Sequence, residues 1–92
     1  MLPRSARSDL IPLFYFHTQT GTRYTDVDGT DLAGPVDARR QAIQTCGQMM
    51  QEAPEGFWGS RPWSVTVTDA VGLVLWEISI DGQSSAATMT MD

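Results

Sequence analysis

The sequence is short of three things that would point to a function. It has one cysteine, no lysine, and no apolar run near the length of about 20 residues that a membrane-spanning helix needs. A single cysteine cannot form an internal disulfide, so nothing implies an oxidising compartment. The six basic residues are all arginine and are scattered among eleven acidic residues, which leaves no basic stripe to follow a phosphate backbone. These absences argue against nucleic-acid binding and against a membrane protein.

The overall balance of residues is that of one small globular domain. The chain has 92 residues, a net charge of −5, 41% hydrophobic residues and 18% charged residues. We expect residues 1–10 to form a flexible arm, residues 11–81 the domain, and residues 82–92 a disordered tail, because the tail has no periodicity. The apolar stretch "LIPLFYF" faintly imitates a signal peptide, but Pro12 interrupts it and no small-residue cleavage site follows. We therefore expect a cytoplasmic protein.

One helix-like pattern lies between two strand-like regions. Residues 12–18 are rich in aromatics and end before Gly21, which predicts a strand with residues 22–25 as its hairpin partner. Pro35 suits the first position of a helix, and Pro54 would stop it. A period of 3.6 places one apolar arc on this helix: Ala42, Ile43, Cys46, Met49, Met50 and Ala53.

The second strand-like region predicts a hairpin. "WSVTVTD" alternates strictly, which places Trp63, Val65 and Val67 on one face. With "DAVG" as the loop, Val67 would pair with Val74 and Val65 with Trp76. The order strand–strand–helix–strand–strand predicts an α+β fold. Its form would be a two-layer sandwich with one helix on one face of a mostly antiparallel, four-stranded sheet.

Several short motifs together resemble a known family. They are the start "PLFYFH", the turn Asp26–Asp28–Gly29, the helix pattern Ala38–Arg39–Ala42, and "VTVTDAVGLVL". This combination resembles a family of short, uncharacterised alphaproteobacterial proteins that is filed as a domain of unknown function. The resemblance covers about residues 12–80 and implies a compact α+β fold and no established activity. This sequence departs from the pattern at Leu13, where a basic residue is usual, and in the connector "FWGSRPW".

His17, the only histidine, is the strongest candidate for chemistry. On a strand it would share a face with Tyr15, opposite the phenylalanines that meet the helix. A general base needs a nucleophile or an orienting carboxylate within hydrogen-bond reach, and Asp26 or Glu77 could serve. The residues alone do not place either carboxylate there, so we expect a structural or interface role for His17.

Other candidate sites are weaker. Asp26, Asp28 and Asp31 could hold a cation, but an EF-hand loop aligned on Gly29 lacks its first and last ligands. We expect a solvated turn and no metal site. The apolar arc favours a buried Cys46 over a nucleophile. No nucleophile elbow, P-loop or dinucleotide fingerprint is present, so no cofactor is expected.

The connector "FWGSRPW" carries aromatic and arginine side chains among glycines and a proline. Such residues dominate binding hot spots, which makes Trp58 and Arg61 candidates for an interface. Alternatively, Trp58 folds back and plugs the open end of the core. Both interpretations are compatible with the sequence.

A single helix can cover only one face of the predicted sheet. The other face would carry a semi-apolar set: Leu13, Tyr15, His17, Thr66, Leu73 and Leu75. Such a face is normally buried, either in a homodimer or against a protein partner. This leads to the first hypothesis, a non-enzymatic, self-associating interaction or regulatory module. Its interface candidates are Tyr15, His17, Trp58, Arg61, Leu73 and Leu75.

Two alternatives come from other classes. The element order and the Asp-x-Asp-Gly turn also resemble antitoxins of the HicB family, which would imply a regulator that binds and blocks a partner protein. The third hypothesis is a small enzyme centred on His17. No nucleic-acid or membrane partner is expected under the first hypothesis.

Overall fold

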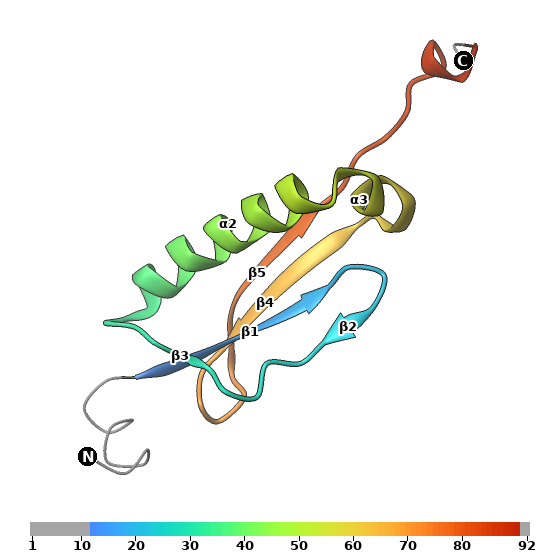
Figure 1. Cartoon of the computed structure of the whole chain (residues 1–92). Helices are drawn as coiled ribbons and strands as arrows, with labels where there is room; N and C mark the ends of the chain where they lie inside the picture. The colour runs from blue at the N-terminus through green and yellow to red at the C-terminus, as the bar shows by residue number, and fades with distance from the viewer. Residues whose placement is uncertain (1–11, 91–92) are drawn as a thin grey trace.

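The structure, a computed structural model, describes residues 12–90. One antiparallel sheet lies beneath helix α2, Pro35–Glu52 (Figure 1). The main strands are β1 (Leu13–Gln19), β4 (Trp63–Thr68) and β5 (Val74–Ile80). Two short strands, β2 (Arg23–Tyr24) and β3 (Thr30–Asp31), complete the sheet. The predicted α+β class is confirmed, but the sheet has five strands instead of four.

The strand order is β2-β1-β4-β5, with β3 also paired to β1. β2 pairs with the end of β1 and β3 with its beginning, so the two short strands share one edge of the sheet. On its other side β1 pairs with β4, with Phe16 opposite Val67 and His17 opposite Thr66. β5 forms the opposite edge, and within residues 12–90 it pairs only with β4.

The register of the β4–β5 hairpin differs from the prediction by two residues. Val67 lies opposite Trp76 and Val65 opposite Ile78, whereas Val74 and Trp76 were expected there. One residue of the difference comes from the loop, which is one residue longer than "DAVG" and sets Thr68 opposite Val74, and the other comes from a bulge between Val67 and Thr68 that inserts Leu75. The two shifts together keep the alternation in phase from Trp76 onward, so Trp76 and Ile78 stay on the predicted apolar face, whereas Val74, predicted there, pairs with Thr68 and is 56% exposed.

The core forms where small side chains of α2 meet the sheet. Ala38, Ala42 and Cys46 are buried against large side chains of β1 and β4: Phe14, Phe16, Val65 and Val67. The predicted arc was too wide on one side, because Ile43 is 59% exposed. The buried side of α2 instead begins at Ala38, one turn before Ala42, where the predicted arc began. Small helix residues let the backbone of α2 approach β4 closely.

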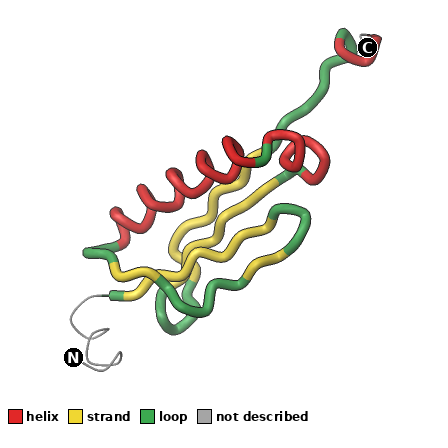
Figure 2. Tube along the Cα trace, viewed as in Figure 1, coloured by secondary structure: helices red, strands yellow, loops and turns green. Residues whose placement is uncertain are grey.

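The connector after α2 is a second helix, α3 (Pro54–Ser60), where no helix was predicted (Figure 2). Pro54 occupies its first turn, where a missing N–H costs nothing. Phe57 is buried and meets Trp63 edge to face, with ring centroids 5.4 Å apart. Phe57 therefore plugs this end of the core, and Trp58, proposed for that role, is 42% exposed.

The predicted terminal segments fall partly outside the description. The arm, residues 1–10, lies outside the described residues, as do residues 91–92 of the tail. After β5 the chain leads away from the sheet to a short 3-10 helix, η1 (Thr88–Thr90) (Figure 1). Between residues 12 and 90 no helix combines the length and apolar character needed to cross a bilayer.

We expect Val65→Ala to lower the free energy of unfolding by about 2 kcal/mol, because Val65 is fully buried and its lost methyl groups leave a cavity beneath α2. Val27→Ala is the matched control, since Val27 is 77% exposed and should change stability little. Urea unfolding of both variants checks this. Equal effects would contradict the described core.

Candidate functional site on the outer face of the sheet

The face of the sheet opposite α2, here called the outer face, is polar. Side chains directly opposite each other in an antiparallel sheet share a face. His17, Thr66 and Glu77 therefore form one row across the outer face, and Gln19, Ser64 and Ser79 form the next. Of the predicted semi-apolar set, Tyr15, His17 and Thr66 do lie on the outer face, but the three leucines do not form an apolar patch there. The bulge lets Leu75 pack against the core, Leu13 is buried, and Leu73 lies in the loop before β5.

His17 is held at both ring nitrogens. Nδ1 accepts the backbone N–H of Asp26 at 3.1 Å, and Nε2 lies 3.0 Å from Thr68 Oγ1. Because Nδ1 is used as an acceptor, the neutral ring carries its proton on Nε2 and donates it to the Thr68 hydroxyl. Tyr15 stacks beside the ring, with centroids 6.5 Å apart and planes 6° from parallel. His17 thus ties the 25–29 loop to β1 and β4.

Asp26 closes a gap in the sheet. On the side of β1 away from β4, the middle of the strand has no strand partner between β2 and β3. There the Phe16 N–H donates to Asp26 Oδ2 at 3.1 Å. Asp26 Oδ1 accepts the N–H groups of Asp28 and Gly29, both at 3.1 Å, in an Asx turn. Partial burial acts to raise the pKa of the Asp26 carboxyl, but these three N–H donors outweigh it and hold the pKa below its ordinary 3.8.

Gly29 completes the turn, and two constraints favour glycine at this position. Its φ of +74° is left-handed, and a Cβ there would lie 3.0 Å from the Tyr15 ring. We call the set Tyr15, His17, Asp26, Gly29 and Thr68 the His17 clasp. Its contacts tie one loop to two strands, and they engage the His17 nitrogens and the Asp26 oxygens that the sequence had offered for chemistry or metal binding.

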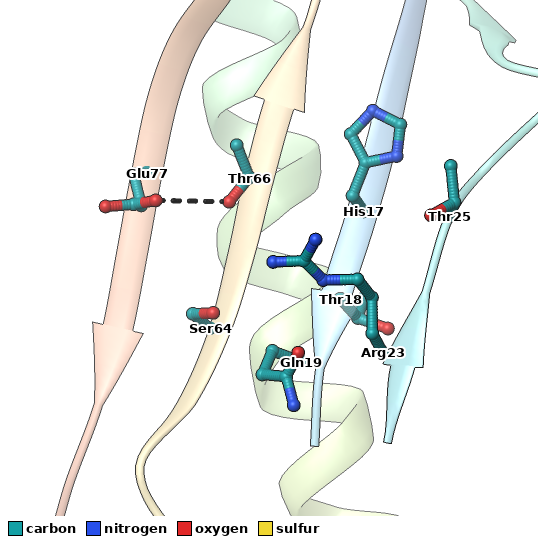
Figure 3. A pocket seen from close by; sticks show the side chains of 8 residues that line it. All are labelled: His17, Thr18, Gln19, Arg23, Thr25, Ser64, Thr66 and Glu77. Atoms are coloured by element: carbon teal, nitrogen blue, oxygen red, sulfur yellow. Dashed lines mark hydrogen bonds between the residues drawn. The ribbon is translucent and has the colours of Figure 1, made fainter. Parts of the chain in front are cut away.

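Beside the clasp the outer face is slightly hollowed, with a volume of about 380 Å³. Figure 3 shows Arg23 reaching from the β2 side across β1, while Glu77 stands on β5 and accepts the Thr66 hydroxyl at 3.2 Å. The rest of the lining is the His17 ring together with hydroxyl and amide groups from Thr18, Gln19, Thr25 and Ser64. That Arg23 and Glu77 line the same hollow was missed in the sequence, although the alternation of "WSVTVT" already placed Ser64 and Thr66 outward.

The other predicted site residues lie apart from the outer face. In the described part of the chain no group of three or more His, Cys, Asp or Glu side chains could hold a metal ion. Asp31 belongs to β3 and pairs with Leu13, away from the Asp26 turn. Cys46 is buried beneath α2, and burial raises the pKa of its thiol, which disfavours the reactive thiolate.

Trp58 and Arg61 form a contact at the end of α3. The Arg61 guanidinium lies 4.0 Å from the centroid of the Trp58 ring and also donates to the Trp58 carbonyl. Arg61 Nε donates to the Gly82 carbonyl at 2.6 Å, and the Trp58 ring packs so close to Gly82 that a Cβ there would lie 2.8 Å away. These predicted interface residues anchor the chain just after β5.

A comparison with protein-family models matches residues 13–81 to a domain of unknown function, DUF6894. The chain belongs to this family. The match begins at the first residue of β1 and ends just after β5, so it contains the sheet, both α-helices and the His17 clasp. The resemblance to an uncharacterised domain family is thereby confirmed. No curated protein and no solved structure matches the chain.

We expect Asp26→Asn to lower stability by about 1–2 kcal/mol at neutral pH, because an amide cannot accept the Phe16 N–H and both turn N–H groups at once. The folded pKa of Asp26 is depressed, so its contribution is fully present above the unfolded pKa and is lost as the pH falls through the folded one. The gap between wild type and variant should therefore narrow below about pH 4. Chemical unfolding at several pH values measures this, and a constant gap would contradict it.

Gly29→Ala should destabilise the fold by more than about 1 kcal/mol, because the left-handed φ and the Tyr15 ring both oppose a Cβ. Gly59→Ala is the control, since no atom lies within 4 Å of a Cβ at that position. Thermal unfolding compares the two. A Gly29 variant as stable as the Gly59 variant would contradict the close packing of Gly29 against the Tyr15 ring.

Proposed function

We propose that the protein is a small non-enzymatic interaction module that binds protein by adding a strand to β5. The proposal rests on a difference between the two edges of the sheet. The β1 edge is closed by β2, β3 and the Asp26 carboxylate, whereas β5 pairs with nothing but β4 among residues 12–90. Every second residue of such an edge strand turns its N–H and C=O outward, ready to pair with another chain.

The β5 edge has little protection against pairing. Edge strands are usually guarded by charged side chains, above all lysine, by proline, by a bulge or by a covering segment. On β5 the guards are the bulge at Leu75 and the single charge of Glu77, and residues 76–80 ("WEISI") otherwise run regularly without proline or a basic residue. Trp76, Ile78 and Ile80 point to the helix side yet are only half-buried, so apolar surface is available beside the unpaired backbone.

Helix α2 adds apolar side chains above the same edge. Val36 and Ile43 are 55% and 59% exposed, and Met50 is half-buried. The Arg39 guanidinium lies 4.9 Å from the centroid of the Trp76 ring on β5, which identifies the β5 side of the helix. At about 100° per residue, the three apolar residues lie within about 60° of Arg39 around the helix axis. We call this stripe and the β5 edge at residues 76–80 together the edge surface.

The outer face supports a non-enzymatic role rather than catalysis. His17 Nε2 meets the Thr68 hydroxyl, but Nδ1 accepts a backbone N–H where a catalytic histidine would donate to an orienting carboxylate. The neutral ring therefore carries its proton on Nε2 and cannot act as a base toward Thr68. Relative to the sequence-based hypothesis, the edge surface replaces the outer face as the main contact region. Trp58 and Arg61 stay candidates for a secondary one. Bacterial origin, a cytoplasmic location and the antitoxin-like alternative stay predictions from the sequence.

Selection of extended peptides from a displayed random library tests this function without a known partner. We expect enrichment of sequences with alternating apolar residues, which would pair with β5 and pack beneath the α2 stripe. Ile43→Glu should weaken their binding about tenfold or more, because a charge would overhang the docked strand. Gln44→Glu is the matched control, since it places the same charge one residue further round α2, away from the stripe. The selection is run at protein concentrations where the chain is monomeric, and failure to select any peptide there, or equal binding by both variants, would contradict the proposal.

A further inference from the structure

We propose that the occupant of the edge surface is a second copy of this chain, in a two-fold dimer centred on Ile78 of β5 and Ile43 of α2. This inference rests on the proposed function and adds the partner and the register. In the dimer β5 pairs antiparallel with the partner's β5, and the two α2 helices pack side by side on the same face of one continuous sheet.

The faces of the sheet limit the possible registers. A two-fold axis perpendicular to the sheet keeps both helices on one side, so helix-side residues must pair with helix-side residues. The axis therefore passes through a residue that pairs with its own copy. The regular part of β5 is residues 76–80, and its midpoint is Ile78.

Charge selects the same centre. If the axis passed through Glu77, the two carboxylates would lie directly opposite each other, which is destabilising. With the axis at Ile78, Glu77 lies opposite the partner's Ser79, whose hydroxyl can donate to it. Trp76 then lies opposite the partner's Ile80, so the half-buried apolar residues of β5 cover one another.

The helix stripe has its own centre of symmetry. Val36, Ile43 and Met50 are spaced by seven residues, so an antiparallel partner helix places Val36 against the partner's Met50 and Ile43 against its own copy. The stripe is thus self-complementary about Ile43. Each Arg39 would lie opposite residue 47 of the partner helix, eight residues from the partner's Arg39. At a rise of 1.5 Å per residue, the two Arg39 side chains are then about 12 Å apart along the helix axis. No like charges then meet between the helices.

The two centres lie at similar levels along α2 and β5. The two elements run in the same direction (Figure 1), the Arg39 guanidinium lies 4.9 Å from the centroid of the Trp76 ring, and Trp76 Nε1 donates to the Pro35 carbonyl at 2.9 Å, so the Trp76 ring lies beside the first turns of α2. Ile43 is four helical residues, about 6 Å, beyond Arg39. Ile78 is two strand residues, about 6.7 Å, beyond Trp76. One axis can therefore pass through both Ile43 and Ile78, and this agreement between independent elements is what assigns the second copy as the occupant.

Sedimentation equilibrium over a range of concentrations tests the dimer, with four variants at exposed positions. The wild type should reach twice the 10.1 kDa of one chain. Ile43→Glu should weaken association about 100-fold, because the substitution meets its own copy at the axis, while Gln44→Glu should leave it within about threefold of the wild type. Ser79→Glu should weaken association about tenfold and Ser79→Lys should strengthen it at low salt only, because residue 79 faces the partner's Glu77. Circular dichroism confirms that each variant is folded.

Each contrary result has a defined meaning. A wild type that stays monomeric overturns this inference, and the peptide selection then decides the proposed function separately. A dimer that Ile43→Glu leaves intact overturns the interface. Equal effects of Ser79→Glu and Ser79→Lys overturn the register. A fifth variant, Glu77→Gln, checks the register separately, because a dimer that it strengthens places the axis at Glu77.

Discussion

The layout of this small sheet depends on one hydrogen bond, which the Phe16 N–H donates to the Asp26 carboxylate. The carboxylate stands where a strand is missing between β2 and β3, and the same oxygens fix the following turn through two further N–H groups. The Asp26 N–H in turn orients the His17 ring. One edge of the sheet is thereby completed within the chain, at a side chain that is charged above its lowered pKa. The opposite edge has no such device among residues 12–90.

The packing of α2 explains why that second edge is surrounded by apolar groups. Ala38, Ala42 and Cys46 seat the helix over β4, and its contact with β5 is limited to one flank. Trp76, Ile78 and Ile80 are consequently half-buried. Val36 and Ile43 are exposed and lie on the flank of α2 that faces β5. A stripe of small residues that brings a helix close to one strand thus leaves the neighbouring strand only partly covered. The proposed module makes use of this remaining surface.

The chain's only histidine shows why residue type by itself does not identify a site. A lone histidine after three aromatics is a reasonable candidate for catalysis, but its function depends on what its two nitrogens meet. Here they meet a backbone N–H and a threonine hydroxyl, and the ring serves as a link between a loop and two strands. The hollow beside it is lined by polar groups, among them Arg23 and the Thr66 hydroxyl that donates to Glu77.

Local periodicity determined much of this protein. The alternation of "WSVTVT", the 3.6-residue pattern after Pro35 and the motifs of the family predicted an α+β domain, the helix, and the buried faces of Val65, Val67 and Cys46, because each depends on neighbours close in sequence. Only the tertiary structure decided the bulge at Leu75, the helical connector and the polar outer face. It also brought Asp26 to β1 and the Arg39 guanidinium over the Trp76 ring. These features depend on contacts between distant segments, and a one-residue insertion is enough to move a side chain from one face of a strand to the other.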